Sequence, residues 1–93
     1  MAVSNASIAT QTPERLIKRL CKHWGHKFPV DLQEQSGTVE LPTGRCSMQA
    51  GGGILEVELE GEQENLPRLQ EVVADHLQRM AASEESLTID WRG

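Results

Sequence analysis

The chain has 93 residues, of which 38% are hydrophobic and 3% aromatic, and its formal net charge is −5 at pH 7. A chain of this length forms one domain with a thin aliphatic core, so we expect residues 1–93 to be a single α+β domain. The few aromatic side chains argue against a base-stacking surface for single-stranded nucleic acid, and the negative charge argues against duplex DNA as a ligand.

The compartment is also constrained by the sequence. No apolar run is long enough to span a bilayer, and residues 1–10 lack the basic start and apolar stretch of a secretory signal. We therefore expect a cytoplasmic protein that does not bind membranes and whose two cysteines are free thiols. Charge is unevenly placed, because residues 1–30 hold five basic residues against one acid while the remainder is strongly acidic.

The first strand and the first helix are predicted from periodicity. Residues 4–10 alternate between apolar and polar side chains, which indicates a short strand. Thr12 and Pro13 then supply a capping residue and a proline at the first helical position, and the helix should end at Gly25. Ile17, Leu20, Cys21 and Trp24 form its apolar stripe.

The middle of the chain predicts four consecutive strands. They cover residues 30–33, 38–41, 45–50 and 54–60, and the turns between them are predicted at Ser36-Gly37, Pro42 to Gly44 and Gly51 to Gly53. Strict alternation of apolar and polar residues gives a sheet with one buried face and one solvent-exposed face, which we call the wet face, as is typical of antiparallel sheets. The side chains expected on the wet face are Glu40, Arg45, Gln49, Glu56, Glu58, Glu60 and Asp90.

The last two predicted elements complete the architecture. Asn65 should cap a second helix that runs to about Ala82, and residues 87–91 alternate like a final strand. The order β-α-β-β-β-β-α-β predicts an α+β two-layer sandwich, in which two helices cover one face of a curved, mainly antiparallel sheet. This arrangement resembles the topology of the TATA-binding-protein-like fold, an analogy of architecture that carries no function.

Several segments together resemble a known but uncharacterised family of small bacterial proteins, a domain of unknown function. The matching segments are Cys21-Lys22-His23-Trp24 with His26-Lys27, Gly44-Arg45-Cys46, Val73-Ala74-Asp75-His76-Leu77 and Ile89-Asp90-Trp91-Arg92. The chain departs from the family pattern at Met80, where an aromatic residue is expected. The resemblance implies a link to iron acquisition, because such domains are also fused to siderophore-interacting flavin proteins, but it brings no catalytic residues.

The densest chemistry lies at the end of the first helix. Lys22, His23, His26 and Lys27, joined by Arg45, could surround a phosphate, carboxylate or catecholate. The structural alternative is that cations at a helix C-terminus simply interact favourably with the helix dipole.

Two other functions remain open. Cys21, Cys46 and His76 are expected to face the core and could bind zinc or iron, with His23 or His26 as a fourth ligand, although no CxxC or HxxxH spacing supports such a site. A thiol and imidazole pair could instead make Cys21 a nucleophile, but its inward direction and the negative helix end both oppose a reactive thiolate.

The sequence therefore favours a non-enzymatic binding or accessory module for an anionic small molecule, without a cofactor. A Cys/His metal site is the alternative, followed by a thiol-dependent enzyme. The possible protein partners are a second copy of the chain, through its basic helix and acidic surface, or a siderophore-interacting flavin protein.

Overall fold

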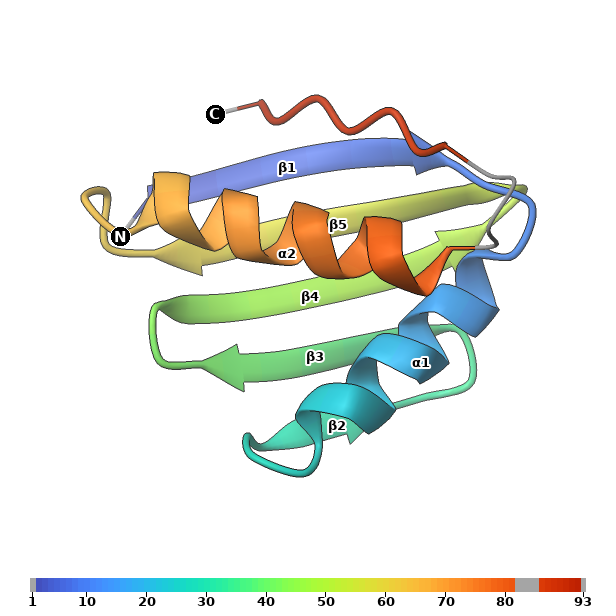
Figure 1. Ribbon diagram of the computed structural model, residues 1–93, viewed down its shortest axis with the longest axis horizontal. Coiled ribbons are helices and arrows are strands. Elements are labelled where there is room, and N and C mark those ends of the chain that lie inside the picture. Colours follow the sequence, from blue (N-terminus) through green and yellow to red (C-terminus); the bar gives the residue numbers. More distant parts are fainter. Residues whose placement is uncertain (1, 82–85, 93) are drawn as a thin grey trace.

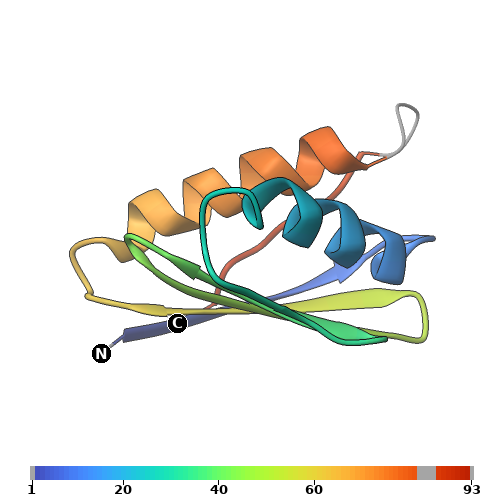
Figure 2. The same cartoon turned by 90° about the horizontal axis from the view of Figure 1, so that it is seen from below.

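The computed structural model describes residues 2–81 and 86–92, and the predicted α+β class is confirmed. The elements are β1 (Ala2–Ala9), α1 (Pro13–Trp24), β2 (Val30–Leu32), β3 (Ser36–Leu41), β4 (Gly44–Gly51), β5 (Ile54–Gly61) and α2 (Leu66–Met80). The strands form one antiparallel sheet in the order β1-β5-β4-β3-β2. Both helices lie on the same face of this sheet, with α1 over β2, β3 and β4 and α2 over β5, β1 and β4 (Figures 1 and 2).

Both helices begin near the predicted residues, but the capping differs. The backbone carbonyls of Thr12 and Asn65 accept the first helical hydrogen bonds, from Leu16 at 3.1 Å and Leu69 at 3.0 Å. Within the described ranges, neither Thr12 nor Asn65 uses its side chain as a cap. Proline in the first turn of each helix, which needs no hydrogen bond from its own nitrogen, therefore contributes more to these helix starts than the predicted side-chain caps.

The core lies between the sheet and the helices. Alternate residues of β4 and β5 are buried, including Cys46, Met48, Leu55, Val57 and Leu59, as the period-2 pattern predicts. The buried side chains of the two helices close this layer from above, and they are Leu16, Ile17, Leu20, Cys21, Trp24, Leu66, Leu69, Val73 and Leu77. None of the helices in the described residues is long and apolar enough to cross a membrane.

The predicted turn at Ser36-Gly37 is wrong, because both residues belong to β3. Gly37 pairs with Met48 of β4 and is buried under α1. A Cβ atom at Gly37 would lie only 2.7 Å from the Sγ atom of Cys21 and 2.8 Å from Cγ2 of Ile17. The glycine here serves the close approach of a helix to a strand. The turn glycines are Gly52 and Gly53, whose φ angles of 56° and 76° agree with the predicted hairpin.

The predicted sixth strand does not form in the described residues. Residues 86–92 instead run beside the outer edge of β1 (Figure 1), where Asn5 and Arg92 form a single bridge through two backbone hydrogen bonds of 2.7 Å. Leu87 is buried and Ile89 and Trp91 are partly buried against the core, so the segment is held by side-chain packing. Asp90 is exposed but lies outside the sheet, and the predicted helix end at Ala82 lies outside the described residues.

Candidate functional site

Four of the predicted ligand-binding residues gather at the end of α1. We call Lys22, His23, His26 and Lys27 the basic turn. The chain does not reverse sharply at Gly25, whose φ of −61° and ψ of −17° continue the helical path. The carbonyl of Trp24 then accepts hydrogen bonds from the amides of both Lys27, at 3.0 Å, and Phe28, at 2.8 Å. This compact turn holds all four basic-turn side chains on the surface.

The basic turn has no counter-charge of its own in the structure. All four side chains are exposed, and none forms a salt bridge with a residue in the described ranges 2–81 and 86–92. The ion pairs that do form involve Arg45 and Arg79. The basic turn is therefore open to an anion from solution, while its cations also complement the negative end of the helix dipole.

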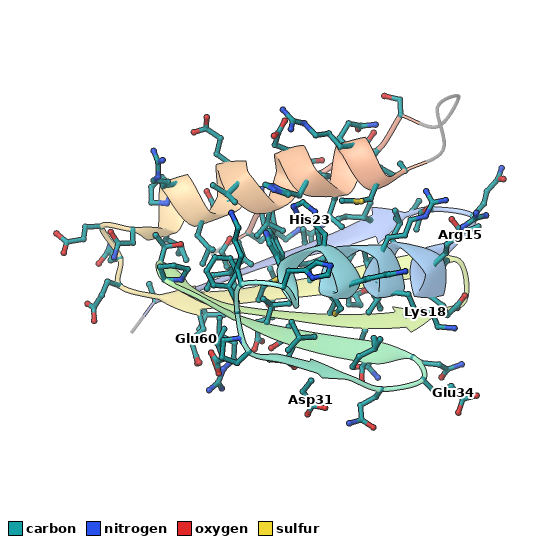
Figure 3. All side chains as sticks on the ribbon, turned by 60° about the horizontal axis from the view of Figure 1, so that its bottom comes forward. Arg15, Lys18, His23, Asp31, Glu34 and Glu60 are labelled. Carbon is teal, nitrogen blue, oxygen red and sulfur yellow. The ribbon has the colours of Figure 1, made fainter. Side chains whose placement is uncertain are left out.

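The structure does not bring Arg45 together with the basic turn. Arg45 lies on the face of the sheet away from the helices, where its Nε is 2.8 Å from Glu40 and its NH1 nitrogen is 3.9 Å from Glu60. Figure 3 shows Glu60 below the sheet and His23 above it, beside the helices. The sheet thus separates Arg45 from the other four residues, and two glutamates already partner its charge.

The two cysteines are free, and both are buried. Cys21 packs from α1 against Gly37, and Cys46 lies on β4 opposite Val39. Burial raises the pKa of the Cys21 thiol, and burial together with the charge of Cys21 raises the pKa of Cys46 to about 12. Because a thiolate is the form that attacks substrates and binds metal, these environments disfavour both the thiol enzyme and the thiolate metal site.

His76, the third residue of the predicted metal set, makes other contacts. Its Nδ1 donates to the backbone carbonyl of Val72 at 2.8 Å. Its ring lies 5.0 Å from the Trp24 ring and 5.4 Å from the His23 ring, measured between centroids. In the part of the chain that the structure describes, no three His, Cys, Asp or Glu side chains are placed to hold a metal ion together.

Two features of the surface were not predicted from the sequence. One is the contact of His23 with His76, which depends on how α1 and α2 cross. The other is a hollow of about 370 Å³ on the wet face of the sheet. The hydroxyl side chains of Ser36 and Thr38 on β3 and of Ser47 on β4 line it beside the longer acids of β5, and this difference in side-chain size can be read from the sequence. The polar side chains around this hollow are those of Asn5, Ser36, Thr38, Ser47, Gln49, Glu56 and Glu58.

Burial of Cys46 predicts a loss of stability in alkali. The folded protein keeps this thiol protonated up to about pH 12, whereas the unfolded chain ionises it from about pH 9. Between these values the unfolded state binds fewer protons, so the free energy of unfolding should fall as pH rises. Urea denaturation at several pH values should show a shallower fall for Cys46→Ala than for the wild type. Because every other titrating group is common to the two proteins, parallel curves would contradict this assignment.

Two comparisons with known proteins each found a similar family or structure. The model of a family described as "Uncharacterized protein conserved in bacteria (DUF2218)" matches residues 5–92. The chain is also similar to the protein in the "NMR structure of PA4090 from Pseudomonas aeruginosa", with 40% sequence identity and a TM-score of 0.82 over 99% of this chain and 96% of that one. None of the curated proteins compared with the chain matches it.

Proposed function

The chain belongs to this family of uncharacterized proteins conserved in bacteria, DUF2218, and from that premise we propose that it is a non-enzymatic binding module for an anionic small molecule. The observation that carries the proposal is the basic turn, four exposed basic or titratable side chains within six residues that form no salt bridge in the described ranges. Exposed cations that form no ion pair are available to form charge-assisted hydrogen bonds with an anion.

The distribution of acids supports the same proposal. The exposed carboxylates of β5, Glu56 and Glu58, lie on the wet face of the sheet, away from α1. The basic turn therefore lies on the opposite side of the sheet from these carboxylates, which favours the approach of an anion although the whole chain is acidic. The helix dipole accounts for cations in the last turn of α1, but His26 and Lys27 lie beyond the helix end.

The ligand we propose carries phosphate, carboxylate or catecholate oxygens. The link to siderophores rests on the sequence resemblance to domains fused to siderophore-interacting flavin proteins, and such a flavin protein is the partner we propose for this cytoplasmic chain. Siderophores bind iron through hard anionic oxygens of these kinds, so an iron-handling role and the charge of the basic turn require the same ligand chemistry.

The proposal predicts a ligand response that depends on two lysines. Phosphate, citrate and 2,3-dihydroxybenzoate should each be tested for a rise in melting temperature, since a ligand that binds only the folded state stabilises it. The variant Lys22→Gln/Lys27→Gln should lose that rise while keeping its unliganded melting temperature nearly unchanged, because exposed charges contribute little to stability.

The matched control is Arg15→Gln/Lys18→Gln. It removes two charges from the same helix, and Arg15 and Lys18 are exposed at a distance from the basic turn (Figure 3). It should keep the ligand response. An equal loss in both variants would mean that net charge alone attracts the anion, and no response from the intact protein to any of the three anions would reject the proposal.

A further inference from the structure

We propose that His23 and His76 together bind a transition-metal ion of the zinc, nickel and copper group, and that the ion clamps α1 to α2. This site shares one residue, His23, with the basic turn but does not depend on anion binding. It also differs from the Cys21, Cys46 and His76 set considered from the sequence, because its ligands are two imidazoles and no thiolate.

The two imidazole rings already lie close together. His23 comes from the last turn of α1 and His76 from α2, and their ring centroids lie 5.4 Å apart at an interplanar angle of 48°. Two imidazoles on one tetrahedral zinc ion, with Zn–N bonds of about 2.0–2.1 Å, have ring centres about 5 Å apart. The two helices therefore already hold the imidazoles at about the separation that a shared ion requires.

A backbone hydrogen bond fixes the tautomer of His76. The Val72 carbonyl can only accept a hydrogen bond, so the Nδ1 atom 2.8 Å away must carry a proton. In the neutral ring the Nε2 atom then keeps its lone pair and can coordinate a metal. Histidine ligands of metals usually donate their other ring nitrogen in this way to a carbonyl or carboxylate, which fixes the ring and increases its basicity.

The His76 ring also packs against a buried side chain of α1. The Trp24 ring lies 5.0 Å from the His76 ring, and Trp24 is itself only 5% exposed. The imidazole of His76 is thus held between the backbone of its own helix and a core side chain. A site with few protein ligands gains from such fixed geometry, because little conformational freedom is lost when the ion binds.

The His76 ring is accessible to solvent and has carboxylates beside it. A hollow of about 210 Å³ beside the ring is lined by Arg68, Glu71, Val72, Asp75 and His76. Asp75 pairs with Arg79 at 3.3 Å, whereas Glu71 forms no salt bridge within the described ranges. The hollow gives water access to the His76 ring, and its lining holds two carboxylates, those of Glu71 and Asp75, against one guanidinium, that of Arg68. Imidazole ligands select zinc, nickel and copper over magnesium or calcium.

The experiment uses the full chain purified without an affinity tag, stripped with EDTA and dialysed. Titration calorimetry with Zn²⁺, and separately with Ni²⁺, should show one ion per chain, and Zn²⁺ should raise the melting temperature. His23→Ala and His76→Ala should each weaken Zn²⁺ binding by at least about tenfold. His26→Ala is the matched control, because His26 is an exposed histidine of the same turn, and it should keep the wild-type affinity within about twofold.

The result for His23→Ala, nitrogen NMR of the wild type and one lysine variant provide further tests of this site. His23 is exposed, so His23→Ala should fold even where His76→Ala loses stability, and unchanged Zn²⁺ binding by His23→Ala would overturn the proposal. Nitrogen NMR of the wild type should show Zn²⁺ shifting Nε2 of His76 while Nδ1 keeps its proton; a Zn²⁺-induced shift confined to His26 would also overturn it. Lys22→Gln/Lys27→Gln should retain Zn²⁺ binding, which separates this site from the anion site.

Discussion

Replacing Trp24 with alanine is expected to lower the free energy of unfolding by about 3–5 kcal/mol. The indole is only 5% exposed and lies in the core between α1, the sheet and α2. Truncation removes its buried apolar area and leaves a cavity that the surrounding elements can only partly fill. Since domains of this size are stable by about 5–15 kcal/mol in total, the variant should unfold at a much lower urea concentration.

The effect should be followed by circular dichroism, because the variant loses one of the two tryptophans of the chain. Trp24→Phe is the control for size, and we expect it to retain part of the stability. Trp91→Ala is the control for position, because Trp91 is only partly buried in the C-terminal segment and should cost less. A loss below about 1 kcal/mol for Trp24→Ala would mean that the indole does not contribute to the core as its burial indicates.

The fold could be predicted from the sequence because apolar residues recur with a clear period along the strands and along both helices. The alternation of glutamates with Leu55, Val57 and Leu59 left only one register with an apolar inner face. The apolar stripe from Ile17 to Trp24 likewise allowed only one face of α1 to pack against the sheet. The last predicted strand failed for a different reason. Leu87, Ile89 and Trp91 do pack inward as the alternation indicated. Side chains can pack inward without pairing of the backbone along β1, and the described residues form a single bridge to that strand.

The candidate site was harder to predict because it depends on distances between elements. Arg45 was grouped with the basic turn by charge, although its alternation with Cys46 already placed it on the other face of the sheet. The charge of a side chain does not show on which face of the sheet it lies, whereas its position in an alternating strand does. The approach of His23 to His76 depends on the crossing of α1 and α2, which local patterns do not determine.

Gly37→Ala is expected to destabilise the protein by about 1–3 kcal/mol, as overpacking of a core does. Glycine in a strand normally costs stability relative to alanine, so an ordinary site would predict a gain instead. Here the added methyl group would lie 2.7 Å from Sγ of Cys21 and 2.8 Å from Cγ2 of Ile17, both buried, so α1 must move away from β3. Urea denaturation of the two proteins measures the difference.

Gly51→Ala is the matched control, because a Cβ atom there meets no atom within 4 Å. The cause can be tested by a double-mutant cycle with Cys21→Ala, which removes the closest contact of the new methyl group. The double variant should lose less stability than the sum of the two single losses, because the methyl group occupies space that the thiol has vacated. If the stability losses of the two single variants are strictly additive, α1 is not in direct contact with β3 at Gly37. A favourable coupling would establish that this glycine sets the distance between α1 and the sheet, and with it the position of the basic turn.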